Sequence, residues 1–451
     1  MAKKGSTRFV CSECGASYAS WSGRCAQCGN WNTLQESLAN AAETLRSTGS
    51  QLSAQSVDAI AKADTVRRIL TGMSDVDVVL GGGFVPGGVV LLAGEPGIGK
   101  STLLLQVSAA VAKQGKVLYV SGEESAHQVG LRASRLGTVT PNLSVAVSAS
   151  ANDIAATIAD GSYDLVVIDS IQTVSVQEVA SAPGSVSQIT NSTQLLSAAA
   201  KQANSALILV GHVTKEGAIA GPKVLEHTVD VVLQLEGDRY GGFKLLRSIK
   251  NRFGSVNETG IFEMGETGLV TVENPSAALL AERQATDGSV VLATMEGSRP
   301  LLVEIQALVN TSSYGYPKRA ASGFDQNRMN LLIAMLERRT KLNLTDKDVY
   351  INVVGGIKIT EPAADLAVVM AIASASKGMQ LKKNAVVFGE LGLSGEVRHV
   401  PYAEKRIAEA KKLGFSGAIG PVNRGKQTSH GLLAVGSVRE ALNTYLEKES
   451  S

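Results

Sequence analysis

Aromatic residues and an excess of one charge are both missing from this chain of 451 residues. Phe, Trp and Tyr make up 4% of the sequence, and 43 Lys and Arg stand against 41 Asp and Glu, for a formal net charge of +2. So few rings argue against a wide platform for stacking nucleic-acid bases. So small a net charge argues against a generally basic surface, and any basic site must be local.

Long apolar runs are also missing. No run approaches the roughly 20 residues that a membrane-spanning helix needs, and the opening residues MAKKGSTRF lack the apolar core of a signal peptide. We therefore expect a cytoplasmic protein without a membrane partner. The length predicts two to four domains, with enough apolar sequence, 44%, for a buried core in each.

Cysteine is absent after residue 28. The four cysteines, Cys11, Cys14, Cys25 and Cys28, form two C-x2-C pairs with ten residues between them. Each pair can supply two thiolates to a tetrahedral ion, so this spacing predicts a structural zinc ribbon over residues 1–34. Two disulfides or a redox pair are the alternatives, but disulfides fit a cytosolic chain poorly.

Two tryptophans, Trp21 and Trp31, flank the second cysteine pair, and we expect them to pack in the small core of the ribbon rather than to stack on bases. The charges of the ribbon also discourage a DNA-finger interpretation. Its cations are Lys3, Lys4, Arg8 and Arg24, against Glu13, Glu36 and an anionic zinc–tetrathiolate centre. Residues 35–65, rich in Ser, Ala, Gln and Asp, predict a linker.

A phosphate-binding loop follows the linker. The segment GEPGIGKST matches G-x4-G-K-[ST], and it lies between the strand-like VVLLA and the helix-like TLLLQVSAAVAKQ. Glycines and a helix N-terminus let backbone N–H groups converge on phosphate oxygens. Within it, Lys100 is predicted to reach the β- and γ-phosphates of ATP, and the Ser101 hydroxyl to ligate Mg²⁺. The predicted nucleotide-binding residues are Gly94, Glu95, Pro96, Gly97, Ile98, Gly99, Lys100, Ser101 and Thr102.

Two acids end predicted strands downstream. DLVVIDS places Asp169 at the carboxyl end of its strand, where parallel sheets bind ligands, and predicts that it holds magnesium through water. KVLYVS ends before Glu123, which is expected to polarise the attacking water, with Glu124 as a weaker candidate. A role of Glu123 at a helix N-terminus is the alternative, because GEES also resembles a helix start.

These segments together resemble a known family. TGMSDVDVVLGGGFVPGG, GEPGIGKST, YVSGEES, VVIDSIQT and VGHVTKEG occur in the order of a RecA-type ATPase core. With the four-cysteine ribbon and KNRFG, nearly the whole chain resembles the bacterial RadA/Sms family of DNA-repair and recombination ATPases. The resemblance implies an α/β protein with three parts: the ribbon, a RecA-like P-loop core over 66–275 and a Lon-protease-like domain over 276–451.

The family implies a ring of subunits, six in number, with nucleotide between neighbours. KNRFG is expected as a turn between FKLLRSI and TGIFEM that projects toward the neighbour's nucleotide. One cation of KNRFG would act as a finger, that is, it would contact the phosphates of the neighbour's nucleotide. Of Lys250 and Arg252, Arg252 is the better finger because its planar guanidinium suits phosphate oxygens. The other cation would couple DNA to ATP, and the sequence leaves open which acts in trans. A solvated turn remains the alternative.

The resemblance also implies DNA partners. Single-stranded DNA would run through the ring past two loops, Val174–Ser187, which has no cation, and Lys215–Lys223, which has two. Such loops predict weak, salt-sensitive and sequence-tolerant binding. The implied function is an ATP-driven DNA motor that moves branch points in recombination intermediates, with branched DNA and the recombinase RecA as further partners.

The last part resembles the proteolytic domain of Lon without its nucleophile. In DVYINVVGGIKITEPAADLAVVMAIASA the serine position falls on Ala363, and the lysine position falls near Glu404 or Lys405. Alanine cannot attack a carbonyl, so we expect a scaffold for assembly and DNA contact. A Lon-type ATP-dependent protease and a KaiC-like signalling ATPase are the alternative functions. Four lysines fit solvated faces or a DNA-binding surface: Lys358, Lys377, Lys382 and Lys383.

Overall fold

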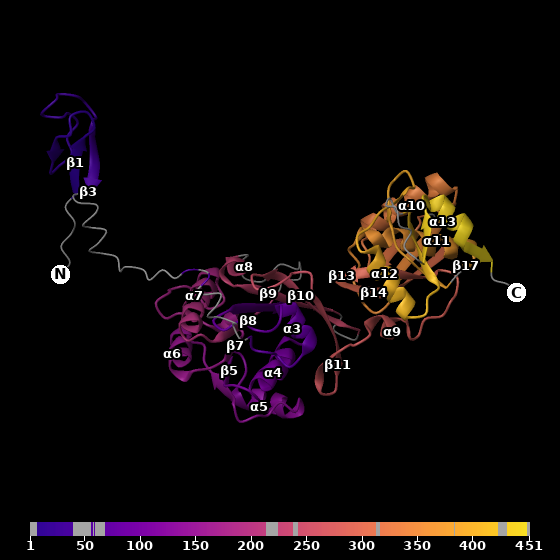
Figure 1. The fold of residues 1–451 in the computed structure, drawn as a ribbon, viewed down its shortest axis with the longest axis horizontal. Helices are drawn as coiled ribbons and strands as arrows, with labels where there is room; N and C mark the ends of the chain where they lie inside the picture. Colours follow the sequence, from indigo (N-terminus) through magenta and orange to yellow (C-terminus); the bar gives the residue numbers. More distant parts are fainter. Residues whose placement is uncertain are drawn as a thin grey trace. The chain divides into compact units, whose positions relative to one another are not determined.

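The computed structural model describes residues 7–38, 56, 58, 68–212, 224–237, 242–312, 316–382, 384–422 and 431–448. The chain divides into two compact units, Met1–Thr65 and Val66–Ser451 (Figure 1). Most of the predicted linker, 35–65, lies outside the described residues. Among the described helices, none is both long and apolar enough to cross a membrane.

The first unit is built on a three-stranded antiparallel sheet. Its strands are β1 (Thr7–Cys11), β2 (Ser17–Tyr18) and β3 (Leu34–Leu38), in the order β2-β1-β3. The third strand continues past the predicted boundary at residue 34 because it pairs with β1 along its whole length.

The core of this unit consists of Cys11, Cys25 and Leu34. Trp21 and Trp31 are 57% and 70% exposed, so the expectation that they fill the core is wrong. The physical reason is that three partly buried side chains, those of Phe9, Ala16 and Tyr18, already pack against these core residues.

A nine-stranded sheet forms the ATPase core, in the order β12-β11-β10-β9-β4-β8-β7-β5-β6. The parallel strands are β4 (Val89–Gly94), β5 (Val117–Ser121), β6 (Leu143–Val147), β7 (Leu165–Asp169), β8 (Ala206–His212) and β9 (Val231–Gly237). The antiparallel strands are β10 (Lys244–Asn251), β11 (Thr259–Gly265) and β12 (Gly268–Thr271). Strands β4, β5 and β7 are continuous apolar runs because helices cover both faces of the sheet.

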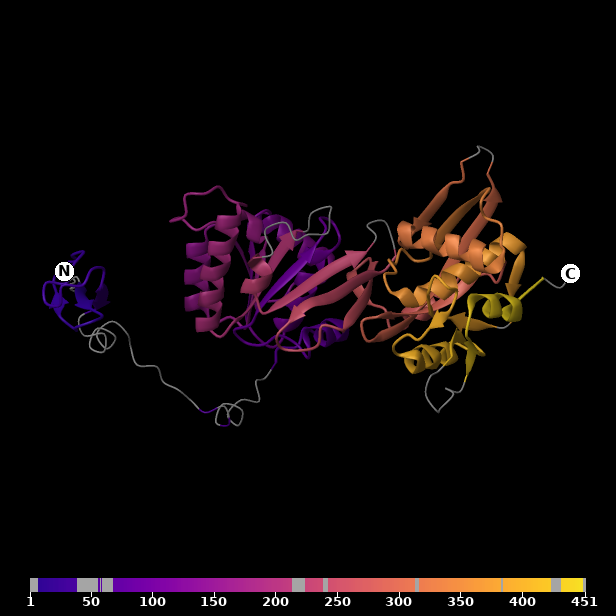
Figure 2. The same cartoon turned by 90° about the horizontal axis from the view of Figure 1, so that it is seen from above.

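Two sets of helices cover these faces (Figures 1 and 2). Helices α3 (Ser74–Leu80), α4 (Lys100–Val111) and α5 (Ala126–Arg135) pack on the face that carries Val90 and Leu92. Helices α6 (Ala151–Gly161), α7 (Val186–Gln202) and α8 (Val224–Thr228) pack on the face that carries Val89 and Leu91. Because side chains alternate between the two faces along β4 and helices cover both faces, the ends of the strands are the accessible parts of the sheet.

The C-terminal domain has a mixed seven-stranded sheet in the order β15-β16-β14-β13-β18-β21-β22. The strands are β13 (Ser289–Glu296), β14 (Arg299–Thr311), β15 (Arg319–Ser322), β16 (Lys347–Val353), β18 (Ala385–Val387), β21 (Gly417–Pro421) and β22 (Leu432–Val435). The helices are α9 (Pro275–Leu280), α10 (Gln326–Thr340), α11 (Asp365–Lys377), α12 (Ala403–Lys412) and α13 (Val438–Tyr445). Helix α11 is apolar on nearly all sides, and it is therefore buried from Asp365 to Ser374.

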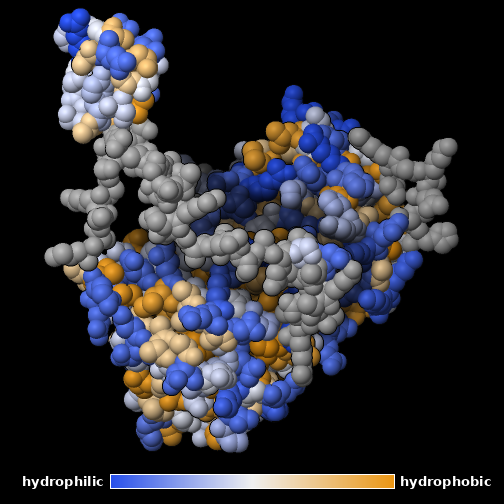
Figure 3. Space-filling model, turned by 60° about the vertical axis from the view of Figure 1, so that its left-hand side comes forward, coloured by the Kyte–Doolittle hydropathy of each residue, from blue (hydrophilic) through white to orange (hydrophobic). Residues whose placement is uncertain are grey.

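Short elements complete the described structure. They are two 3₁₀ turns, η1 (Ile171–Thr173) and η2 (Pro362–Ala364), and the strand pairs β17 (Met379–Leu381) with β23 (Leu446–Lys448) and β19 (Glu390–Leu391) with β20 (Val397–Arg398). The space-filling view in Figure 3 shows hydrophilic and apolar residues interspersed on the surface of the larger unit.

Candidate functional site

The phosphate-binding loop joins the end of β4 to the start of α4. Gly97 and Gly99 have φ angles of 80° and 119°, which only glycine adopts without strain. A Cβ atom at Gly94 would lie 2.7 Å from the carbonyl oxygen of Leu235. Ile98 is buried in the core and anchors the loop in front of the helix N-terminus. The loop therefore has the backbone shape that an anion-binding helix start requires.

Lys100 is buried at the first position of α4. Its Nζ atom donates to the carbonyl oxygens of Gly94 at 2.8 Å and Glu95 at 3.0 Å. Burial lowers the pKa of Lys100, while the negative charges of Asp169 and Glu123 act in the opposite direction. The fold thus brings the predicted lysine within the electrostatic reach of both predicted acids. Ser101 and Thr102 follow on the first turn of the helix, and both are partly buried.

Asp169 is the last residue of β7, as the sequence predicted. It lies opposite Ser121 of β5, and its Oδ2 atom accepts a 2.5 Å hydrogen bond from the Tyr119 hydroxyl. Burial, followed by the charge of Asp169, raises the pKa of Tyr119 well above its usual value, so the phenol stays protonated and keeps donating. Tyr119 therefore orients the carboxylate, a positioning role that the motif search did not identify.

Glu123 and Glu124 have separate partners. Oε1 of Glu123 accepts a 2.5 Å hydrogen bond from Ser170, the residue after Asp169. Glu124 forms an ion pair with Arg132 of α5. The N-cap of α5 is Ser125, which forms a capping box with Gln128. Glu123 is therefore not the N-cap of α5. Its contact with Ser170 places it next to the end of β7, where Asp169 lies, whereas Glu124 is held by Arg132 of α5.

KNRFG differs from the predicted turn. Strand β10 continues through Asn251, because Lys250 and Asn251 pair with Val232 and Val231 beyond a bulge that follows Ser248. Lys250 is therefore a strand residue, and the turn begins at Arg252. Nζ of Lys250 donates to the carbonyl oxygens of Glu226 and Val229 at 2.6 and 2.7 Å.

The side chain of Arg252 is 57% exposed. Its Nη1 atom lies 3.1 Å from Oδ1 of Asp230, a carboxylate that also accepts the Val89 N–H at 3.1 Å. Burial and the adjacent Arg252 charge lower the pKa of Lys250. The two cations are thus held side by side, one by backbone carbonyls and the other by a mostly buried acid.

The two ends of β9 separate KNRFG from the phosphate loop of the same chain. Val231, opposite Asn251, pairs with Val90 near the start of β4, whereas Leu235 pairs with Gly94 at its end. Four strand residues span about 13 Å. The structure therefore does not bring Lys250 and Arg252 to Lys100 within one chain.

Of the two predicted DNA loops, the first is described. Gln188 of α7 is buried and organises it, because its side chain accepts the Val176 N–H at 2.9 Å and donates to the carbonyl oxygens of Val176, Val179 and Ser181. Sequence analysis missed Gln188, since a lone glutamine carries no motif. The second loop, Lys215–Lys223, lies outside the described residues, as does Lys383.

A salt bridge in the C-terminal domain joins residues close in the sequence to the positions matched to the Lon dyad. Ala363 is buried in η2, two residues after Glu361. The buried Arg406 guanidinium donates to both carboxylate oxygens of Glu361, at 2.8 and 2.7 Å, and to the Ala293 carbonyl oxygen at 2.5 Å. Lys405 donates instead to the Ser298 carbonyl oxygen at 3.2 Å, and Glu404 is exposed. Arg406, which follows Lys405 directly in the sequence, is thus the cation of this region that pairs with an acid.

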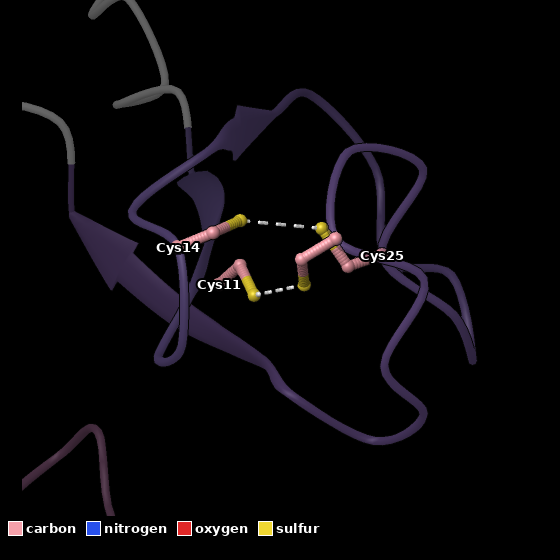
Figure 4. Close-up of side chains that lie close together, drawn as sticks. Cys11, Cys14 and Cys25 are labelled. Atoms are coloured by element: carbon pink, nitrogen blue, oxygen red, sulfur yellow. Dashed lines mark hydrogen bonds between the residues drawn. The ribbon is translucent and has the colours of Figure 1, made fainter.

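The four cysteine sulfurs gather at one end of the ribbon (Figure 4). All four lie within 4.8 Å of one another, with Cys11–Cys28 and Cys14–Cys25 separations of 3.6 Å. Four ligands about 2.3 Å from a tetrahedral zinc ion would be spaced in this way. The Tyr18 hydroxyl lies 3.4 Å from Cys25 Sγ and lowers the pKa of that thiol to about 6, which favours the thiolate that zinc needs. The donor set fits a structural Zn²⁺.

Comparison with known families identifies each part of the chain. Residues 9–36 match a model described as a rubredoxin metal-binding domain, residues 58–218 match an AAA domain, and residues 311–424 match subunit ChlI of Mg-chelatase. The fold is therefore a zinc ribbon, a RecA-like P-loop ATPase core and a Lon-protease-like α/β domain.

Full-length relatives have the same organisation. "DNA repair protein RadA" of Pseudomonas aeruginosa is 47% identical over 98% of this chain and 100% of its own length. The proteins of the same name from Bacillus subtilis and Escherichia coli are each 46% identical, over 98% and 99% of this chain and 99% of their own lengths. A crystal structure of the RadB recombinase is 22% identical over 46% of this chain and 100% of its own, with a TM-score of 0.37 that is too low to support an inference.

Proposed function

Because this chain belongs to the RadA family of DNA repair proteins, we propose that it is a DNA-dependent ATPase motor of homologous recombination and repair. The motor binds single-stranded DNA and moves branch points in recombination intermediates. Its partners are single-stranded and branched DNA and the recombinase RecA, and it acts in the cytoplasm.

The nucleotide site is assigned to the loop Gly94–Thr102. Lys100 contacts the β- and γ-phosphates, exchanging its carbonyl partners of 2.8 and 3.0 Å for phosphate oxygens. Ser101 and Asp169 hold Mg²⁺, which supplies charge neutralisation at the phosphates when it is bound. Glu123 orients the attacking water and accepts its proton, in the position that its Ser170 hydrogen bond defines.

One observation carries the motor assignment: the KNRFG cations lie at the end of the sheet opposite to the phosphate loop. A cation about 13 Å away along the strands cannot serve its own nucleotide. It can serve the nucleotide of a neighbour, provided that the subunits pack head to tail in a closed ring. Arg252, exposed and held by a single acid, is the finger, and Lys250 couples DNA occupancy to the position of Arg252.

This arrangement supports a homo-oligomeric ring, a hexamer by the family resemblance, with DNA in its centre. The C-terminal domain serves as an assembly and DNA-contact scaffold rather than as a protease. Supporting this, the position matched to the Lon serine is Ala363, and Arg406, next to the position matched to the lysine, is engaged in an ion pair with Glu361.

The test is ATP turnover by the purified protein with and without single-stranded DNA. We expect stimulation by DNA, and branch movement on a three-stranded DNA substrate. The Arg252→Ala protein should lose about 10³-fold of turnover, since a finger in trans is worth about that much. Turnover that ignores DNA, together with absent branch movement, would contradict the motor.

Mixing two inactive variants isolates the action in trans. Lys100→Ala and Arg252→Ala subunits, mixed before assembly, should regain partial turnover, because some interfaces then pair an intact loop with an intact finger. Arg135→Ala, at the end of α5, is the matched control for removal of an arginine. If the mixture stays as inactive as either variant alone, Arg252 does not act across subunits.

A further inference from the structure

Trp21 and Trp31 form an exposed aromatic surface on the ribbon. Both rings border the same residue, because a Cβ atom at Gly23 would lie 3.9 Å from Trp21 Cη2 and 3.7 Å from Trp31 Cζ3. Neither ring belongs to the core, and they are 57% and 70% exposed. We call Trp21, Gly23, Arg24 and Trp31 the tryptophan face. The fold leaves both rings exposed, so their apolar faces are available to a partner.

The hairpin that carries the second cysteine pair holds this face in place. Arg24 and Trp31 pair as an antiparallel bridge, and the Asn32 N–H donates to the Gly23 carbonyl oxygen at 2.8 Å. The next residue, the metal ligand Cys25, donates its N–H to the Asn30 carbonyl oxygen at 2.9 Å. The backbone below both rings is therefore the same hairpin that presents the second cysteine pair, so the rings are pre-positioned before they meet a partner.

A cation completes the face. The Arg24 guanidinium lies 5.7 Å from the centroid of the Trp31 ring, and its Nε atom donates to the Gly29 carbonyl oxygen at 2.7 Å. The guanidinium is thus held over one face of the Trp31 ring, which leaves the opposite face for a base. Stacking rings with an adjacent cation are how sequence-tolerant proteins hold single strands, the ring on a base and the cation on a phosphate.

The residues next to the two rings favour unpaired bases over a protein as the partner of this face. Each tryptophan has polar residues on both sides in the sequence: Ser20 and Ser22 around Trp21, and Asn30 and Asn32 around Trp31. The centre of a protein interface is a continuous apolar patch, which this is not. Isolated rings in a polar, hydrogen-bonding setting suit unpaired bases, whose edges are polar and whose faces are apolar.

We propose that Trp21 and Trp31 stack on unpaired bases of single-stranded DNA, with Arg24 on an adjacent phosphate. The proposal rests on the proposed function, since it names a second place where the motor holds its strand. It also accounts for the low charge of the ribbon: a site that works by stacking neutralises few phosphates, so its binding weakens little with salt.

The chain provides its own probe. Both of its tryptophans belong to the face, so intrinsic tryptophan fluorescence of the zinc-loaded full chain reports on this surface alone. Titration with oligo(dT) should quench the emission to saturation, and quenching should persist at moderate salt. An abasic oligodeoxynucleotide of equal length, which offers phosphates without bases, should leave the emission unchanged.

Variants measure the contribution to affinity. By fluorescence anisotropy of labelled oligo(dT), the Trp21→Ala/Trp31→Ala protein should bind about 5-fold or more weaker, since stacking contributes at least that per base. Trp21→Phe/Trp31→Phe should retain most of the affinity. Val139→Ala, which shortens an apolar side chain that is 72% exposed in the ATPase core, is the control for loss of exposed apolar surface and should bind like the unchanged protein. Zinc content confirms that each ribbon is folded.

Three results would overturn the proposal: no quenching by oligo(dT), equal quenching by the abasic strand, or unchanged affinity of the double alanine variant. Emission that responds to a recombinase protein but not to oligo(dT) would likewise overturn it, and would make the face a protein dock. ATP turnover separates this proposal from the motor. If DNA stimulates turnover without any quenching, the face proposal alone fails; if quenching occurs without stimulation, the face proposal is supported and the motor fails.

Discussion

The nucleotide centre of the ATPase core and the Ala363 centre of the C-terminal domain differ in the groups that contact their buried cations. In the nucleotide centre, Lys100 donates to the carbonyl oxygens of Gly94 and Glu95, and the charges of Asp169 and Glu123 act to raise its pKa. In the Ala363 centre, Arg406 contacts both carboxylate oxygens of Glu361, and Thr294 Oγ and the Met295 N–H donate to the same carboxylate at 2.5 and 2.9 Å.

This difference distinguishes a site whose cation can bind a ligand from an ion pair that stabilises the fold. A lysine that donates to neutral carbonyl groups can turn to phosphate oxygens without breaking those contacts at a large electrostatic cost. A buried guanidinium that contacts both oxygens of a partly buried carboxylate cannot leave without removing the cation of that carboxylate. Mutation of the nucleotide centre should therefore reduce ATP turnover and leave the stability of the protein nearly unchanged. Mutation of the Ala363 centre should reduce stability and leave ATP turnover nearly unchanged.

Removal of the lysine tests the first half of this comparison and has the largest expected effect. Lys100→Ala should abolish measurable ATP turnover, because it removes both a phosphate contact and the charge that stabilises the transferred phosphate. Its thermal unfolding should stay close to that of the unchanged protein, since burial disfavours the charged amine and lowers its pKa. Exposed Lys113, just after α4, provides the control variant. A large loss of stability in Lys100→Ala would erase the contrast.

Exchange of the two neighbouring glutamates sharpens the assignment inside the nucleotide centre. Glu123→Gln keeps the size of the side chain but removes the proton acceptor, so turnover should fall by about 10²–10⁴-fold while nucleotide binding remains. Glu124→Gln should lose far less, because Glu124 is held by Arg132 on α5. Turnover and binding of a fluorescent nucleotide, measured on both variants, decide between them; equal losses would contradict the separation of roles.

Breaking the Arg406–Glu361 salt bridge tests the prediction that the Ala363 centre contributes to stability. Arg406→Leu should destabilise the C-terminal domain by about 3–5 kcal/mol, because it leaves the partly buried Glu361 carboxylate without its cation. The double variant Arg406→Leu/Glu361→Leu should recover much of that loss. Chemical denaturation measures both, with Lys405→Ala as the exposed neighbouring control. If the single and double variants are equally stable, the pair does not hold the framework.

Restoring the missing nucleophile has the smallest expected effect. Ala363→Ser should destabilise by about 1 kcal/mol, the cost of placing a hydroxyl in a buried apolar position, and should hydrolyse no peptide. The nearby lysine, Lys405, donates to the Ser298 carbonyl oxygen, and Arg406 is engaged with Glu361. A casein-degradation assay checks this, and any activity above that of the unchanged protein would mean that the dyad survives in another form.

Several features of the site could be predicted because they depend on neighbours in the sequence. The four cysteines, the loop Gly94–Thr102 and the strand end at Asp169 were placed correctly, since each is set by local backbone geometry and by apolar runs of strand length. The end of β10 was not, because the pairing of Lys250 with Val232 comes from a bulge and from a strand that is distant along the chain. The burial of Trp21 and Trp31 was also predicted wrongly, since a hydrophobic side chain does not reveal how little space a small core has.

The amino-acid sequence by itself determined the parts of this protein: a metal-binding ribbon, a phosphate loop before a helix and a Lon-like domain with alanine at the nucleophile position. These follow from short-range spacing, which fixes what a few consecutive residues can bind. Only the tertiary structure decided that KNRFG lies at the far end of the sheet from the phosphate loop, that Arg406 pairs with Glu361 and that two rings are left outside the ribbon core. Such outcomes depend on which strands become neighbours and on how much volume they enclose, and both arise from contacts between residues that are far apart in the chain.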